Sequence, residues 1–140
     1  MSDPKIDALS RVPLFVGCDR KELEFLVTRT DQVDVEAGKT LIHQGSPADT
    51  FYVLLDGEAR VEVDGKTRPP LQAGSFCGEI SMMDRGPATA TVVTTTPTKL
   101  MVMSHTQFRD AIKANDQLLS HVMSAAAERL RRDSLERQKG

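Results

Sequence analysis

Hydrophobic positions change their spacing twice along this chain, so that helical ends flank a middle region rich in strands. A short helix is predicted before Pro13, with Ser2 and Asp3 suited to its first turn. A second helix begins near Asp19, where apolar residues recur at the i, i+3, i+4 spacing of an amphipathic helix, at Leu23, Leu26 and Val27. We therefore expect the N-terminal helices within residues 3–29.

Short runs rich in Val, Thr, Leu and Phe follow in residues 30–104, separated by glycines. Such runs are typical of strands joined by turns, and Asp56-Gly57 and Asp64-Gly65 are pairs of the type that close tight hairpins. Many short strands at regular spacing predict a mainly β fold, arranged as a sandwich or a barrel-like roll. The clearest predicted strands span residues 32–36, 40–43, 51–55, 59–63, 89–95 and 99–103.

The helical period returns in residues 105–137. Thr106 is placed to cap a short helix, and Asn115 or Asp116 to cap a longer helix that ends near Arg137. Arginines and acidic residues alternate on the longer helix, a mixture typical of a solvated surface with i, i+4 charge pairs. This helix also carries an apolar stripe, whose members are Leu119, Val122 or Met123, Ala126 and Leu130.

The composition is that of an ordinary globular protein with few aromatic residues. Hydrophobic residues make up 39% of the 140 positions, charged residues 27% and aromatic residues 4%, so the core must consist mainly of aliphatic side chains and methionine. A chain of this length supports one hydrophobic core, and we expect residues 1–140 to form a single domain.

Charge and cysteine content argue against several classes of protein. A formal net charge of −2 disfavours binding to nucleic acid, which requires a concentrated basic surface. No apolar run approaches the roughly 20 residues of a membrane helix, and the first residues do not resemble a secretion signal. Cys18 and Cys77 lack the spacing of a disulfide framework or a zinc site. We therefore expect a soluble, cytoplasmic protein that contacts neither nucleic acid nor membrane.

Catalytic and metal-binding constellations are missing from the sequence. His43 is the one histidine of the strand-rich region, whereas a metal centre on such a roll needs several His and Glu side chains on neighbouring strands. The serines lack the G-x-S-x-G setting of a hydrolase nucleophile. We expect neither an enzyme nor a bound metal or organic cofactor.

Two segments of the strand-rich region carry an ordered set of motifs. Residues 38–57 contain a glycine turn, a corner ending in Q-G, an acidic residue and an F-Y-V-x-x-x-G strand, in this order. Residues 74–83 follow the pattern G-x-x-F-G-E-L/I-A/S-L, with Cys77 between the phenylalanine and the second glycine. Together with the terminal helices, these motifs resemble the cyclic-nucleotide-binding domain family along nearly the whole chain. The resemblance implies a jelly-roll-like β-roll (a double-stranded β-helix) with flanking helices, and a phosphate-binding cassette with a short helix at residues 78–92.

The predicted cassette begins with a strand, a glycine turn and a helix start, which together form an anion site. The first amides of a helix have no intrahelical acceptor, so they converge on one point. Those amides belong to Gly78, Glu79, Ile80 and Ser81. The resemblance implies that Glu79 accepts hydrogen bonds from a ribose 2′-hydroxyl. Outside that resemblance, a glycine turn followed by glutamate is commonly just a favourable charge at a helix start.

The cassette departs from the family pattern at its arginine. The family loop ends in P-R-A/S/T-A-T/S-V, and its arginine holds the cyclic phosphate, whereas an ungapped count from Gly78 places Ala88 at that position. A hydrogen bond to a charged group contributes about 1.5–3 kcal/mol, so we expect the affinity to fall roughly ten- to a hundred-fold. The Thr89 hydroxyl and the Ala90 N–H remain as contacts. Arg85 is either a substitute phosphate contact or a solvated loop residue.

Two functions are consistent with these features. The first is a regulatory domain that binds cyclic AMP or cyclic GMP, with weakened affinity, through the cassette residues named above. The second is a degenerate fold of the same kind that acts without a ligand. It would use the stripe of the last helix to form a homodimer or to bind a partner protein.

Overall fold

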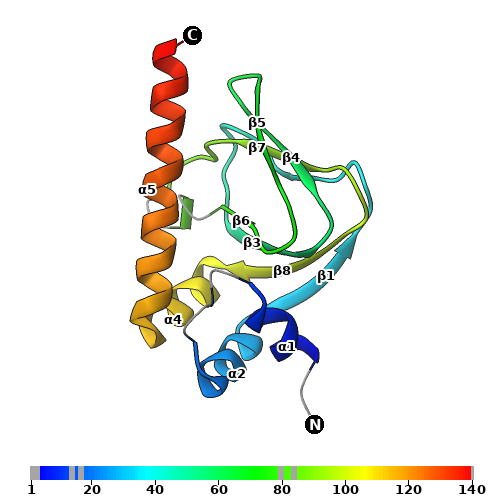
Figure 1. The fold of residues 1–140 in the computed structure, drawn as a ribbon, viewed down its shortest axis with the longest axis vertical. Coiled ribbons are helices and arrows are strands. Elements are labelled where there is room, and N and C mark those ends of the chain that lie inside the picture. The colour runs from blue at the N-terminus through cyan, green and yellow to red at the C-terminus, as the bar shows by residue number, and fades with distance from the viewer. Residues whose placement is uncertain (1–3, 13–14, 16–17, 79–80, 83–84, 140) are drawn as a thin grey trace.

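Eight short strands form two antiparallel sheets of four strands each in the computed structural model, which describes all residues except 1–3, 13–14, 16–17, 79–80, 83–84 and 140. The first sheet has the order β1-β8-β3-β6, and the second has the order β2-β7-β4-β5. The two sheets face each other as a roll, which confirms the predicted fold class (Figure 1). The strands are β1 (Asp31–Val35), β2 (Thr40–Ile42), β3 (Thr50–Asp56), β4 (Ala59–Val63), β5 (Lys66–Leu71), β6 (Phe76–Cys77), β7 (Thr91–Thr94) and β8 (Thr98–Ser104).

Alternation along the strands of the first sheet separates two hydrophobic cores. On β3, Phe51 packs toward the helices, whereas Leu54 packs between the two sheets. On β8, Met101 and Met103 pack toward the helices, and Leu100 lies between the sheets. Successive side chains of a strand point to opposite faces, so one sheet serves both the helical layer and the inside of the roll.

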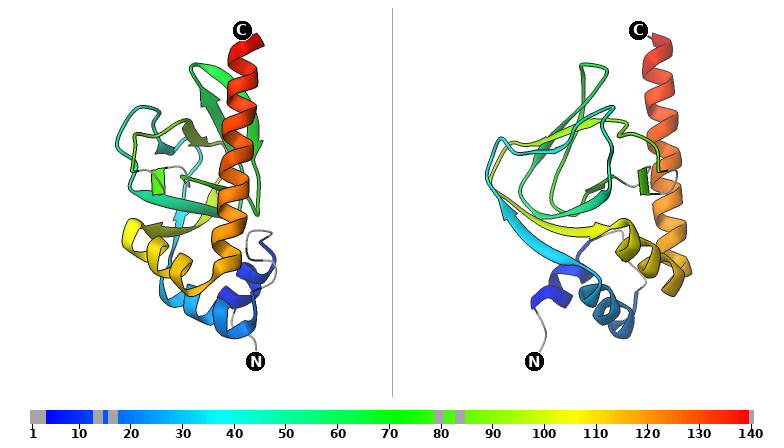
Figure 2. Two further views of the ribbon diagram at one scale, coloured as in Figure 1. Left: turned by 90° about the vertical axis from the view of Figure 1, so that its left-hand side faces the viewer. Right: turned by 180° about the vertical axis from the view of Figure 1, so that it is seen from behind.

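The helices cover the outer face of the first sheet and one side of the roll. Three of them lie against the outer face of the first sheet, and the last runs along the side of the roll (Figures 1 and 2). No helix in the described part of the chain has the length and apolar composition needed to span a bilayer. The bounds of these helices are α1 (Pro4–Ser10), α2 (Arg20–Thr28), α4 (His105–Ala114) and α5 (Asp116–Lys139).

Side-chain caps fix where these helices begin. Asp19 forms a capping box at the start of α2. Ser104 forms the corresponding box at the start of α4, so the prediction of Thr106 as the cap was wrong. Asn115 caps α5, because its Oδ1 accepts hydrogen bonds from the N–H groups of Gln117 and Leu118 at 3.0 and 3.2 Å.

The inner face of α5 matches the predicted apolar stripe only in part. Its buried positions, each 3% exposed or less, are Leu118, Val122 and Ala126. The predicted stripe members Leu119 and Leu130 are half-buried and 51% exposed, respectively, and Met123 is 54% exposed. Val122 and Ala126 are therefore confirmed as stripe members, whereas Leu118 is buried in place of Leu119, and Met123 and Leu130 lie on the surface.

Of the two Asp-Gly pairs, one joins paired strands of the same sheet and the other joins strands of different sheets. Asp64 and Gly65 have φ values of 54° and 77° and close the β4–β5 hairpin as a two-residue turn, as predicted. Gln44 holds this turn through two hydrogen bonds of 2.8 Å, donating from Nε2 to Asp64 Oδ1 and accepting from the Asp64 N–H. Asp56-Gly57 instead leads from β3 of the first sheet to β4 of the second, so the hairpin predicted there was wrong.

Candidate functional site

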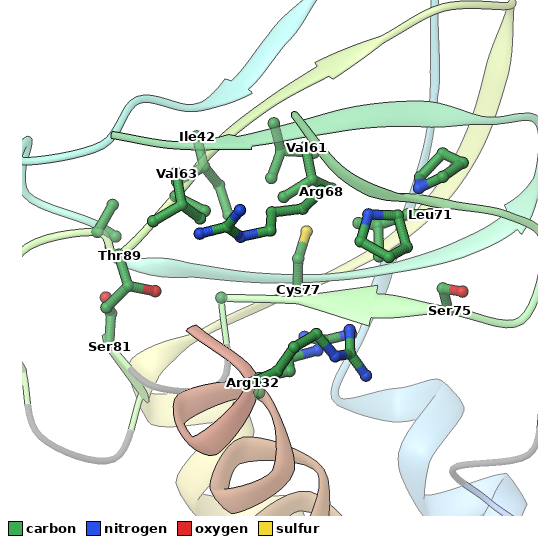
Figure 3. A pocket seen from close by; sticks show the side chains of 18 of the residues that line it. Ile42, Val61, Val63, Arg68, Leu71, Ser75, Cys77, Ser81, Thr89 and Arg132 are labelled. Atoms are coloured by element: carbon green, nitrogen blue, oxygen red, sulfur yellow. The ribbon is translucent and has the colours of Figure 1, made fainter. Parts of the chain in front are cut away.

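A cavity of about 330 Å³ lies inside the roll, beside α5 (Figure 3). Its volume is at the lower end of the roughly 300–1,000 Å³ that is typical of small-molecule pockets. The cassette, β6 and one face of α5 form part of its lining. The second sheet supplies an aliphatic wall, made by Ile42, Val61, Val63, Leu71 and Val92.

The cassette residues predicted from the sequence gather at this cavity. Glu79 and Ile80 belong to that prediction but lie outside the described residues. The other five predicted residues all line the cavity: Gly78, Ser81, Ala88, Thr89 and Ala90. Segments that are about ten residues apart in the sequence are therefore brought to one place in the fold.

A helical turn follows the cassette strand. The Met82 N–H donates to Gly78 O at 3.2 Å, and the Arg85 N–H donates to Ser81 O at 2.9 Å. Ser81 is 3% exposed, and its hydroxyl lies 3.5 Å from Pro87 O. Gly78 has a φ of 91°, and a Cβ at this position would lie 2.6 Å from Thr50 O. The cassette strand thus passes so close to β3 that a side chain has no room.

Ala88 forms part of the packed wall. It is 5% exposed and belongs to the core between the sheets. Its N–H donates to Ser46 O and its carbonyl accepts from the Gly45 N–H, both at 2.9 Å. The Ala88 backbone is therefore engaged within the protein, and the side chain offers a ligand only a methyl group.

Arg85, the predicted substitute contact, lies next to the cassette turn but outside the cavity lining. It is exposed, has a φ of 57°, and is not among the described residues that line the cavity. Arg85 therefore contacts the predicted site only through its backbone hydrogen bond to Ser81 and is not part of the described cavity lining.

Three arginines that the sequence patterns did not assign to the site line the cavity: Arg68 from β5, and Arg129 and Arg132 from α5. Arg129 Nη2 donates to Phe76 O at 2.6 Å, and its guanidinium lies 4.7 Å from the centre of the Phe76 ring. Arg132 pairs with Glu128, which also lines the cavity, at 3.6 Å. Positive charge thus exceeds negative charge among the described lining residues, which favours an anionic ligand.

Tyr52, on the strand next to the cassette strand, is not among the described residues that line the cavity. Tyr52 of β3 pairs with Cys77 of β6 and donates a hydrogen bond to Leu41 O at 3.3 Å. Burial raises the pKa of Tyr52, and the neighbouring Cys77 raises it further, so the phenol stays protonated at neutral pH. The described residues also contain no group of three or more His, Cys, Asp or Glu side chains that is able to hold a metal ion.

Known proteins share both the sequence pattern and the fold. The model of the cyclic nucleotide-binding domain matches residues 32–115, well over half of the chain. A CRP-like cAMP-activated global transcriptional regulator of Mycobacterium tuberculosis is 26% identical over 131 residues, which cover 90% of this chain and 58% of that protein. A cAMP-dependent protein kinase regulatory subunit of Aspergillus fumigatus is 32% identical over 104 residues, which cover 72% of this chain and 25% of that protein.

A solved structure supports the same assignment at the level of the fold. The catabolite activator protein of Thermus thermophilus matches with a TM-score of 0.79 at 24% identity, over 90% of this chain and 62% of that chain. The chain spans less than two thirds of the length of each of these three proteins. With the match to the family model, these findings show that the chain belongs to the cyclic nucleotide-binding domain family, which is a family of regulatory modules and not of enzymes.

Proposed function

We propose that this chain is a regulatory domain that binds cyclic AMP or cyclic GMP in the cavity between the sheets, with an affinity weakened by Ala88. The observation that carries the proposal is a single cavity that joins cassette residues to an aliphatic wall. A nucleotide needs both surfaces, because its base buries apolar area while its phosphate requires N–H donors and positive charge. The family match supports this assignment.

Each part of the ligand has a matching surface in this proposal. The base packs against Val61 and Val63 of the second sheet, which line the cavity. The phosphate approaches the helix start that follows Gly78, where backbone N–H groups favour an anion. The ribose 2′-hydroxyl donates to Glu79, a role that rests on the family pattern. The charge balance of the chain supports a small anion as the partner and gives no support for nucleic acid.

Isothermal titration of the full chain with cyclic AMP and with cyclic GMP, each raised to millimolar concentration, tests this proposal. We expect saturable binding of at least one nucleotide. Glu79→Ala is expected to weaken that binding about tenfold or more, because it removes a charged hydrogen-bond acceptor. Glu24 lies on the exposed face of α2, away from the cavity. Glu24→Ala removes the same charge there and is expected to leave nucleotide binding unchanged. A wild-type protein that responds to neither nucleotide contradicts the proposal.

A second function is favoured by the surface of α5. Met123 and Leu130 are 54% and 51% exposed, and such side chains suit a contact with a second copy or with another protein. In that case the domain has lost its ligand, and the wild-type protein binds neither nucleotide. Ala88→Arg is then expected to create measurable binding in the same titration. A wild-type protein that binds before the substitution is made counts against this alternative.

A further inference from the structure

A row of paired residues crosses the second sheet and ends at an arginine. In the strand register, Ile42 pairs with Val92, Val92 with Val61, and Val61 with Arg68. Directly paired residues of antiparallel strands project from the same face of a sheet. All four residues line the cavity. The register therefore turns Arg68 into the cavity beside three aliphatic side chains.

The side chain of Arg68 points toward the cassette. Figure 3 shows it extending from β5 along the aliphatic wall, in the direction of the side where Ser81 and Thr89 lie. Both of those residues carry hydroxyl groups and belong to the cassette that is predicted to receive the phosphate. A ligand oxygen in the cavity between Arg68 and the cassette would thus face the Arg68 guanidinium of β5 on one side. On the other side it would face the hydroxyl donors of Ser81 and Thr89.

The backbone on both sides of Arg68 is held in place. The turn before it is anchored by the two hydrogen bonds between Gln44 and Asp64. Pro69 and Pro70 follow it, and the ring of each proline restricts the backbone to a φ near −65°. A side chain that starts from a fixed backbone loses less conformational freedom when it binds a ligand.

The other two lining arginines have different positions. Both belong to α5 and approach the cavity from its side, not from the sheet wall. The Arg132 side chain is 47% exposed, so solvent screens its charge. Arg68 is the lining arginine that lies in the sheet wall and is half-buried there.

We propose that Arg68 binds the phosphate of the ligand and supplies from β5 the positive charge that Ala88 does not supply from the cassette. The ligand class is a nucleoside with a singly charged cyclic phosphate, so the inference rests on the proposed function. A guanidinium suits this role because its planar fork of N–H donors matches two phosphate oxygens. A bound nucleotide would then connect the second sheet to the cassette.

The test compares cyclic AMP with adenosine, which lacks the phosphate, by isothermal titration of the wild-type chain and of Arg68→Ala. We expect Arg68→Ala to weaken cyclic AMP binding about ten- to a hundred-fold and to leave adenosine binding unchanged. Arg68→Lys is expected to retain part of the lost affinity, because it keeps the charge without the fork. Combining Arg68→Ala with Ala88→Arg is expected to restore cyclic AMP binding, since the arginine then returns from the cassette side.

Arg60→Ala is the matched control. Arg60 lies on the adjacent strand β4, forms an ion pair with Glu62 at 3.5 Å, and is not among the described residues that line the cavity. Its cyclic AMP affinity should equal that of the wild type, and melting curves should show that every variant is folded. The inference alone is overturned if the wild type binds cyclic AMP and Arg68→Ala binds it equally well, or if Arg68→Ala weakens cyclic AMP and adenosine alike. A wild type that binds no cyclic nucleotide overturns the proposed function, and the inference with it.

Discussion

Replacing Phe51 with alanine is expected to lower the free energy of unfolding by about 3–5 kcal/mol, which is the usual cost of truncating a fully buried phenylalanine. Phe51 is 1% exposed. Its ring centre lies 5.6 Å from that of Phe76 and 5.0 Å from that of Phe108. It thereby joins three elements, β3, the cassette strand β6 and α4. Urea denaturation of the wild type and the variant measures the loss.

The same substitution at Phe25 provides the control for Phe51. Phe25 lies on α2, is half-buried, and has the guanidinium of Arg29 stacked on its ring at 4.8 Å. Its truncation is expected to cost roughly 1 kcal/mol, because less apolar area returns to water and the surface can relax. Equal losses for the two variants would show that Phe51 is not the central contact between the cassette strand and the helices.

Replacing Gly78 with alanine is expected to cost about 2–4 kcal/mol of stability and to abolish nucleotide binding at the concentrations that saturate the wild type. The φ of 91° strains any residue with a side chain. The added Cβ would also lie 2.6 Å from Thr50 O and 3.4 Å from Phe51 Cα. These atoms belong to the backbone of a central strand, so the cassette must move instead. Urea denaturation and titration with cyclic AMP measure the two effects.

Gly38→Ala separates backbone strain from steric contact. Gly38 has a φ of 85°, similar to that of Gly78, but a Cβ there meets no atom within 4 Å. The expected cost is therefore the conformational term alone, about 1 kcal/mol, with nucleotide binding unchanged. If Gly78→Ala proves no more damaging than Gly38→Ala, then the close approach of the cassette to β3 is not needed for the site.

Much of the fold follows from local patterns that the structure confirms. Asp64-Gly65 closes the β4–β5 hairpin because both residues adopt positive φ. Gly78 and Ala88, which an ungapped count along the chain placed at the two ends of the cassette, line one cavity. These features depend on neighbouring residues or on a fixed count along the chain, so the sequence alone is sufficient to predict them.

Features that depend on a choice between equivalent positions were not predictable. Leu118 and Leu119 are adjacent and equally apolar, as are Val122 and Met123, so helical spacing cannot decide which row faces the core. The core between the helices and the first sheet makes that choice, and it selects Leu118 and Val122.

The arginines of the site illustrate a second limit of sequence patterns. No strand was predicted at β5, because proline is disfavoured within a sheet and this segment contains Pro69 and Pro70. Without a predicted strand, the sequence could not indicate which way Arg68 points. Its inward direction comes from pairing with Val61, a contact set by the three-dimensional register. Ala88 was visible from the motif, whereas the residue that we propose to replace its missing charge became visible only in the fold.

A crystal structure of the chain with cyclic AMP is the measurement that tests the central claim most directly. The account predicts the nucleotide inside the cavity, with its base on Val61 and Val63 and its phosphate between Arg68 and the cassette residues Ser81 and Thr89. A cavity that remains without nucleotide at saturating cyclic AMP, or a nucleotide bound outside it, would contradict the claim that this domain is a nucleotide-binding regulatory module.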